Sequence, residues 1–165
     1  VLSLRPITAT VERDDDMTSM TPPDGFRHHI AMPVRWSDLD ALGHVNNAVY
    51  LTYFEQARIS YFNALALWDG SLNKLGLIMA RAVIDYKLPL NASDDVHVFT
   101  RTKRLGTKSF DTEQAIVRRV DDQWQVAANG LITIVVFDYQ TNQSAPMPAA
   151  WREMLTAYEP APIQT

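Results

Sequence analysis

The segment DLDALGHVNNAVYLTYFEQAR, from Asp38 to Arg58, joins a polar loop to a regular apolar pattern and gives the strongest indication of the fold. After the loop, apolar residues recur at steps of three and four, which predicts an amphipathic helix. These positions are Tyr50, Tyr53, Phe54, Ala57, Tyr61, Ala64 and Leu65. Asn46 or Asn47 can cap the start of the helix, and Gly70 can end it. The pattern therefore predicts one helix of about 22 residues, on the order of 33 Å long.

Extended runs surround this helix in the sequence. They are Arg27–Trp36 before it, and Leu77–Lys87, Asp95–Arg104, Ser109–Val120 and Trp124–Phe137 after it. In the first run apolar and other residues alternate, and Pro33 favours an edge or bulge position. Short connections such as Asp121-Asp122-Gln123 join the later runs and favour antiparallel neighbours. We predict an α+β fold in the order strand, helix and four strands, with the helix buried against a mainly antiparallel sheet.

The two ends of the chain differ from this central part. Residues 1–25 have no regular period, so we interpret them as a tail outside the core. We assign the domain to residues 26–140. Residues 141–165 form a C-terminal extension, in which apolar residues at helical spacing predict a short helix. Those residues are Trp151, Met154, Leu155 and Tyr158.

Length and composition restrict the class of protein. A chain of 165 residues with 47% hydrophobic residues suits one globular domain. The net charge is −4, of which −3 falls in residues 1–25, so we expect no nucleic-acid partner, although one small phosphate-bearing ligand is compatible. The sequence has no cysteine, which excludes disulfides and thiolate metal sites. No stretch has the roughly 18 apolar residues of a membrane-spanning helix, so we expect no membrane partner and a cytoplasmic location.

The polar loop carries the residues best suited to chemistry. It places Asp40, His44 and Asn47 beside the predicted helix start, where unpaired backbone N–H groups favour negative charge. Gly43 allows a tight bend and the close approach of a ligand. An acid or base beside oxyanion donors is what acyl transfer needs. The alternative interpretation is structural, since asparagines before a helix often serve only as caps and loop aspartates are common.

The motif from Asp38 to Arg58 resembles the signature of the hotdog-fold thioesterases of the 4-hydroxybenzoyl-CoA thioesterase family. The matching pattern is Asp38-x-Asp40-x-x-Gly43-His44-Val45-Asn46-Asn47-x-x-Tyr50-x-x-Tyr53-Phe54-Glu55-x-Ala57-Arg58. The resemblance implies a curved antiparallel sheet wrapped around a central helix. It also implies hydrolysis of an acyl-CoA or acyl-carrier-protein thioester, with coenzyme A as part of the substrate and no separate cofactor. A homodimer with joined sheets and interfacial sites is implied as well, and many relatives form homotetramers from two such dimers.

The same resemblance assigns roles to residues of the loop. Asp40 corresponds to the essential carboxylate, as nucleophile or general base, and the backbone N–H of Asn47 to the oxyanion donor. Gly43 and Asn46 fall in the substrate-binding part of the motif. His44 resembles a histidine of plant acyl-carrier-protein thioesterases, but Leu42 stands where they have asparagine. Two alternatives therefore remain for the smallest set of catalytic residues: Asp40 with His44, or Asp40 alone.

Glu55 is an alternative catalytic carboxylate, because another branch of the hotdog thioesterases works from a carboxylate on the helix. It precedes Arg58 by three residues, so an ion pair on the helix surface is the competing interpretation, and the one that we favour. We interpret Asp38 as a loop residue that supports the site.

A basic cluster surrounds the turn at Gly106. It comprises Arg101, Lys103, Arg104 and Lys108. In the resembled family the stretch from Arg104 to Phe110 lies near the partner subunit's site, so we expect Arg104, Lys108 and Ser109 to bind the phosphates of coenzyme A. The alternative is a solvated hairpin rim whose charges discourage edge pairing.

Other functions remain open at this stage. The histidines His28, His29 and His97 lack the spacing of a zinc site, so we expect no metal. Other hotdog proteins hydrate or dehydrate acyl thioesters with a histidine and a carboxylate, and a binding module without catalysis is a third hypothesis.

Overall fold

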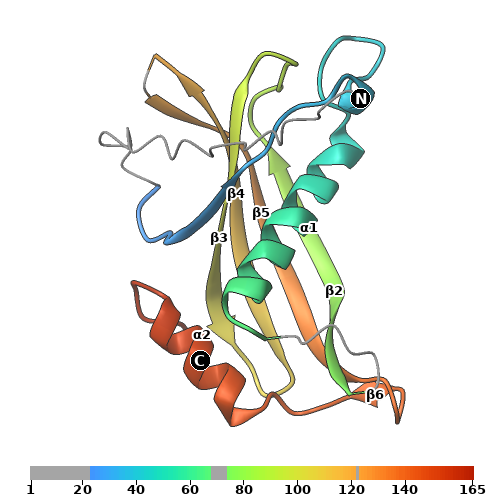
Figure 1. The fold of residues 1–165 in the computed structure, drawn as a ribbon, viewed down its shortest axis with the longest axis vertical. Helices are drawn as coiled ribbons and strands as arrows, with labels where there is room; N and C mark the ends of the chain where they lie inside the picture. The colour runs from blue at the N-terminus through green and yellow to red at the C-terminus, as the bar shows by residue number, and fades with distance from the viewer. Residues whose placement is uncertain (1–22, 68–73, 122) are drawn as a thin grey trace, which may run out of the picture.

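One antiparallel sheet and one long helix organise the chain (Figure 1). The computed structural model describes residues 23–67, 74–121 and 123–165, so most of the predicted tail lies outside the described residues. The elements are β1 (His28–Ala31), the 3₁₀ turn η1 (Trp36–Asp38), α1 (Asn47–Ala64), β2 (Leu75–Tyr86), β3 (Asp95–Leu105), β4 (Ser109–Val120), β5 (Gln123–Asp138), β6 (Gln143–Ser144) and α2 (Ala149–Tyr158).

The sheet has the strand order β1-β3-β4-β5-β2, and the short β6 pairs with β5. Every pair of neighbouring strands is antiparallel, as predicted. The strand predicted over Arg27–Trp36 is correctly placed at an edge but ends at Ala31. Met32 still donates from its backbone to Val96 (2.7 Å), whereas Pro33 has no N–H to continue the ladder. Residues 36–38 then turn into η1.

Helix α1 has 18 residues, fewer than predicted. The side chain of Asn46 caps it by accepting a hydrogen bond from the backbone N–H of Ala48 (2.9 Å). The helix ends at Ala64, six residues before Gly70, so the prediction that Gly70 ends it was wrong. Gly70 itself lies outside the described residues. Ala66 takes a positive φ of 48°, which breaks the helix and returns Leu67 to the core, where it is fully buried.

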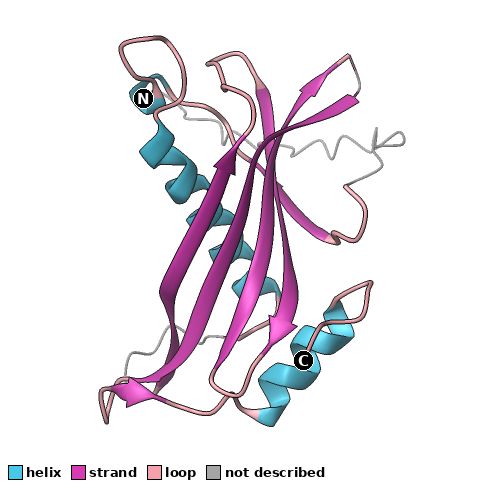
Figure 2. Cartoon of the chain, turned by 180° about the vertical axis from the view of Figure 1, so that it is seen from behind, coloured by secondary structure: helices cyan, strands magenta, loops and turns pink. Residues whose placement is uncertain are grey.

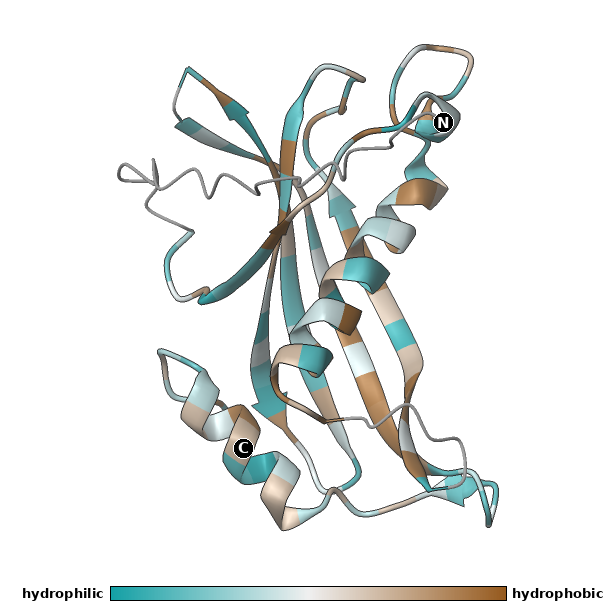
Figure 3. Ribbon diagram, in the orientation of Figure 1, coloured by the Kyte–Doolittle hydropathy of each residue, from teal (hydrophilic) through white to brown (hydrophobic). Residues whose placement is uncertain are grey.

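The aromatic side of α1 packs against one face of the sheet. In the view from behind, the strands lie in front of the helix (Figure 2). Tyr53, Phe54 and Tyr61 are buried as predicted. Phe54 lies so close to β5 that a Cβ on Gly130 would approach its ring to 3.0 Å. Buried and half-buried residues alternate along β5 from Gly130 to Val136, as the two-residue period of a strand requires. Figure 3 shows brown apolar segments of this strand beneath the helix.

Helix α2 confirms the short helix predicted near the C-terminus. Its Leu155 is fully buried in the core cluster that contains Phe110. Arg152 Nη2 donates to the carbonyl of Gly106 (2.6 Å), and the backbone of Met147 bonds that of Thr107 (2.9 Å). The C-terminal segment therefore braces the turn between β3 and β4. Within the described ranges, neither helix is long and apolar enough to cross a membrane.

Candidate active site

The polar loop before α1 is anchored by a buried carboxylate, that of Asp38. Its Oδ1 accepts from Arg35 Nη2 (2.9 Å), and its Oδ2 accepts from the Tyr53 hydroxyl (2.7 Å) and the backbone N–H of Arg35 (2.9 Å). Burial alone would raise the pKa of Asp38, but these hydrogen bonds outweigh burial and hold the pKa below its ordinary value. Asp38 is therefore an ionised structural anchor, which agrees with its predicted supporting role.

Asp40 lies at the bend of the loop and is half-buried. Its Oδ1 accepts hydrogen bonds from the backbone N–H groups of Leu42 (2.8 Å) and His44 (3.4 Å). Gly43 takes a positive φ of 81° at the tip of this turn, which satisfies the tight bend expected there. Among the residues that the structure describes, no donor is recorded for Oδ2 of Asp40, so this oxygen is available to a substrate or a water molecule.

His44 contacts Asp40 through the backbone rather than through its ring. The N–H of Asp40 donates to the carbonyl of His44 (2.8 Å), and the N–H of His44 points back to the Asp40 carboxylate. No hydrogen bond of the His44 imidazole is recorded within residues 23–67, 74–121 and 123–165. This arrangement favours Asp40 alone over an Asp40–His44 pair.

The N-terminus of α1 lies directly after the loop. Asn46 is used as the cap, while the backbone N–H of Asn47 has no acceptor in the described part of the chain. The carbonyl of Asn47 accepts from the hydroxyl of Tyr86 at the end of β2 (2.9 Å), which fixes the first turn of the helix against the sheet. An unused N–H at a helix N-terminus is a suitable donor to an oxyanion.

An open groove of about 550 Å³ lies beside the loop. It is lined by Val34, Trp36, Leu39, Gly43, Asn91, Ala92 and Ser93. The side chains of Trp36 and Leu42 are 85% and 81% exposed at this end of the molecule. Of these two residues, Trp36 lies in the groove wall and gives the groove an apolar side.

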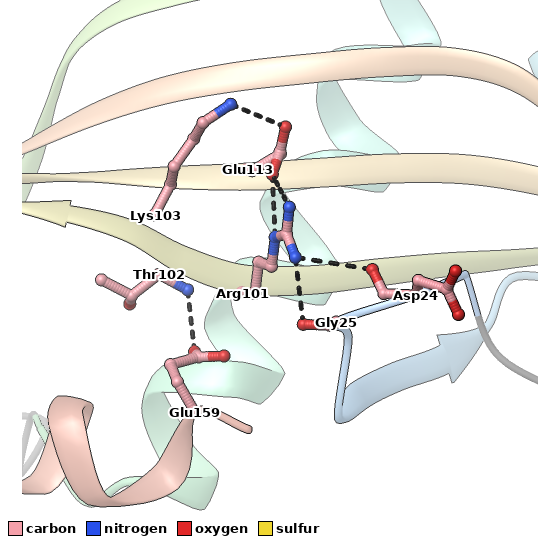
Figure 4. Close-up of polar contacts among 7 residues, drawn as sticks. All are labelled: Asp24, Gly25, Arg101, Thr102, Lys103, Glu113 and Glu159. Carbon is pink, nitrogen blue, oxygen red and sulfur yellow. Dashed lines mark hydrogen bonds and ion pairs between the residues drawn. The ribbon is translucent and has the colours of Figure 1, made fainter. Parts of the chain in front are cut away.

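The basic cluster near Gly106 is largely paired within the chain. Arg101 Nε and Lys103 Nζ on β3 both contact Glu113 on β4 (2.8 and 2.9 Å), as Figure 4 shows. In the same view Arg101 also reaches the backbone carbonyls of Asp24 and Gly25, at the end of the predicted tail. These pairings favour a structural role for Arg101 and Lys103, as in the alternative interpretation of the cluster.

The predicted phosphate-binding residues differ in how strongly they are engaged. Arg104 pairs with Asp111 (2.7 Å), whereas Lys108 is exposed. Among the described residues, the ammonium of Lys108 has one hydrogen bond, to the carbonyl of Ser144 (3.3 Å). The carbonyl of Ser109 closes the turn by accepting from Gly106 (2.7 Å). Lys108 is therefore the cation of this turn best placed to meet an added phosphate.

The loop and the Gly106 turn do not meet within one chain. Val45 at the loop bonds the backbone of Leu90, shortly before β3, whereas Gly106 follows the last residue of that strand. Ten residue steps along β3 separate these ends by about 33 Å. The predicted catalytic and phosphate-binding residues can form one site only if a second subunit contributes one of the two sets.

Glu55 and Arg58 do not form the predicted ion pair. No nitrogen of Arg58 lies within 4.0 Å of the Glu55 carboxylate, although Arg58 is buried and Glu55 is exposed. Both instead line a pocket between α1 and β2. The prediction was wrong because Arg58 is buried beside Phe62. The available signal was the apolar residue Phe62, four residues after Arg58 and therefore on the same face of the helix.

The three histidines lie on different faces of the sheet. His28 bonds the hydroxyls of Ser60 (3.1 Å) and Tyr158 (3.2 Å), whereas His29 and His97 face each other with ring centroids 5.7 Å apart. In the described ranges no group of three or more acidic or histidine side chains is placed to hold a metal ion.

Comparisons with known proteins agree with this architecture. Residues 34–155 match the family described as the thioesterase-like superfamily. The chain is 30% identical over 132 residues to the long-chain acyl-CoA thioesterase FadM of Escherichia coli, which covers 74% of this chain and 92% of that protein.

Solved structures give the same result. A thioesterase from Thermus thermophilus, crystallised with coenzyme A and zinc, is 37% identical, with a TM-score of 0.74 over 86% of this chain and all of that one. A thioesterase superfamily protein from Jannaschia is 25% identical, with a TM-score of 0.75 over 81% of this chain and 84% of that one. Sequence match and architecture agree: the chain belongs to the thioesterase-like superfamily and has the hotdog fold.

Proposed function

We propose that this protein is an acyl-CoA thioesterase, which hydrolyses its substrate to a free acid and coenzyme A. The observation that carries the proposal is the 30% identity to a long-chain acyl-CoA thioesterase across 92% of that protein's length. The structure of the Thermus thermophilus relative with bound coenzyme A supports the same class of substrate. Coenzyme A enters as part of the substrate, and we propose no separate cofactor.

We assign the chemical step to Asp40 and Asn47. In the general-base route, Asp40 removes a proton from a water molecule as the water oxygen attacks the thioester carbon. The developing oxyanion accepts a hydrogen bond from the backbone N–H of Asn47. The C–S bond then breaks, and the coenzyme A thiolate leaves and takes up a proton. The free Oδ2 of Asp40 supports this role, and direct attack by that oxygen is the nucleophilic variant of the same route.

The active site is proposed to lie between two subunits. Strand β2 pairs only with β5 in the described chain, so its outer edge can pair with the β2 of a second copy. Antiparallel pairing around a two-fold axis brings the Leu75 end of one β2 beside the Tyr86 end of the other. The Tyr86 end touches Asn47. A homodimer of this kind brings the loop of one subunit toward the end of its partner that carries the Gly106 turn; a homotetramer of two dimers stays a prediction.

In this arrangement the partner's turn would hold the phosphates of coenzyme A. Lys108 is the principal cation in the proposal because, within the described part of the chain, its ammonium bonds a carbonyl and no carboxylate. Arg104 can add charge only while it shares its guanidinium with Asp111. Ser109, Gly43 and Asn46 are proposed to line the substrate path at the two ends. A cytoplasmic location also stays a prediction.

The test of the catalytic assignment is Asp40→Asn, measured with a panel of acyl-CoAs and a thiol-trapping reagent. Asparagine keeps an oxygen that can accept from Leu42 and His44, so the loop should stay folded, but it cannot act as a base. We expect a loss in kcat of at least about 10²-fold.

The matched control is Asp121→Asn, at a hairpin position with φ 48°, which asparagine tolerates. It should leave turnover unchanged. Full activity in Asp40→Asn would contradict the role of Asp40. Release of no thiol by the wild type, together with hydration of an enoyl thioester, would replace the thioesterase by a hydratase.

A further inference from the structure

A pocket of about 410 Å³ opens between α1 and the edge strand β2. Most of its wall is apolar, from Ile59, Phe62, Leu77, Ile78, Met79 and Ile134. The polar residues Glu55, Arg58 and Tyr139 complete the wall. An apolar cavity with few polar groups is typical of a small-molecule site, and the polar groups select the ligand.

Arg58 is the unusual member of this wall. Arg58 is only 7% exposed. Its Nη1 atom is buried without a hydrogen-bond partner in the described part of the chain. Burial lowers the pKa of Arg58 from its ordinary value, and the charge of Glu55 partly opposes this effect. A buried donor without a partner is costly to the folded protein, so an oxygen supplied by a ligand would be bound favourably there.

The pocket and the proposed active site lie along the same face of α1. Asn47, Leu51, Glu55, Arg58 and Phe62 follow one another at steps of four or three residues, which places them on the same side of the helix. Leu51 is 38% exposed on this face and provides apolar surface between the two ends. Eleven residues separate Asn47 from Arg58, a distance of about 17 Å along the axis.

We propose that this pocket binds the distal part of the acyl chain and that Arg58 donates a hydrogen bond to a hydroxyl group carried there. The inference rests on the proposed thioesterase function and adds the class of acyl group. A hydroxyl can accept from Arg58 and donate to Glu55 in the same pocket. A carboxylate could accept from Arg58 as well, but the negative charge of Glu55 opposes it. A plain hydrocarbon leaves the donor of Arg58 unpaired.

The test compares dodecanoyl-CoA with 12-hydroxydodecanoyl-CoA in the wild type and in Arg58→Met, which keeps much of the side-chain length without any N–H. We expect the wild type to favour the hydroxylated substrate by about 10-fold or more in kcat/KM, because the hydrogen bond is to a charged donor. Arg58→Met should abolish this preference, so that its two kcat/KM values become equal. Arg119→Met, an equal chemical change at the far end of β4, is the control and should keep the preference.

Binding of the free acids separates this inference from the proposed function. The unfolding temperature is measured with dodecanoic acid or 12-hydroxydodecanoic acid, and a larger stabilisation by the hydroxy acid in the wild type than in Arg58→Met supports the pocket assignment. That result without any thioester hydrolysis would retain the assignment and reject the thioesterase. Equal substrate preference in wild type and Arg58→Met would overturn the inference. A higher wild-type kcat/KM for 3-hydroxydodecanoyl-CoA, or for a substrate with a terminal carboxylate, than for 12-hydroxydodecanoyl-CoA would also overturn the inference.

Discussion

Two aspartates in the same loop have opposite environments. Asp38 is buried and held by Arg35 and Tyr53, whereas Asp40 is half-buried and keeps one carboxylate oxygen free of recorded donors in the described chain. The spacing Asp-x-Asp does not distinguish them. The difference arises because the hydroxyl of Tyr53, fifteen residues later, reaches Asp38 across the first turns of α1. A tertiary contact of this kind leaves no local pattern in the sequence.

The Asp38 anchor makes a prediction about pH. Asp38→Asn should lower the free energy of unfolding at pH 7 by about 2 kcal/mol or more, because hydrogen bonds to a charged group are lost from a buried site. The pKa of Asp38 is lowered in the folded protein, so its ionised form contributes stability above the unfolded pKa of about 3.9. That contribution is lost as the pH falls through the lower folded pKa. Urea unfolding at pH 7 and at pH 3 measures it.

Tyr53→Phe is the companion variant, since it removes one donor and keeps the buried ring. It should cost about 1–2 kcal/mol at pH 7 and less in the acid. A penalty for Asp38→Asn that is equal at both pH values would show that shape, and not charge, holds the loop.

At the scale of elements, the repeating patterns predicted most of the fold. The stripe from Tyr50 to Tyr61 gave α1, and Ser109–Val120 gave β4 with the observed bounds. The end of α1 was predicted wrongly, because Leu65 and Leu67 continue the apolar composition while the backbone at Ala66 has already turned. The pairing of Arg101 and Lys103 with Glu113 was also missed, because cross-strand partners depend on register rather than on local sequence.

Helix α2 was predicted from the sequence, but its contribution to the hydrophobic core was not. The sequence suggested an extension outside the domain, while Leu155 fills the core beside Phe110. We expect Leu155→Ala to lower the free energy of unfolding by about 2–5 kcal/mol, from lost burial and the cavity left behind. Urea denaturation checks this. Glu153→Ala, exposed on the same helix, should change it by less than about 0.5 kcal/mol. A similarly small effect of Leu155→Ala would show that the extension is dispensable.

At the scale of the whole molecule, the proposed shared site depends on the outer edge of β2, which pairs with no other strand in the described part of the chain. The two sets of residues proposed to handle one substrate lie at opposite ends of β3, about 33 Å apart. No rearrangement of the loop alone spans that distance. Neither composition nor local pattern reveals this separation, because it follows from strand order and direction. The resemblance to a dimeric family predicts a shared site, and the separation of the two sets is a physical reason to expect one.

Ala80 offers a direct test of this edge. It is exposed near the middle of β2, and the register with β5 skips it, from Met79 opposite Ile134 to Arg81 opposite Thr133. Proline at Ala80 should therefore disturb the chain's own sheet little, while its missing N–H and its ring oppose pairing with a second β2. We expect Ala80→Pro to be monomeric in analytical ultracentrifugation, to keep its far-UV circular dichroism, and to lose most thioesterase activity. Ala80→Ser should remain dimeric and active. A fully active Ala80→Pro monomer would show that one chain contains the complete site, and an intact Ala80→Pro dimer would place the interface on another surface.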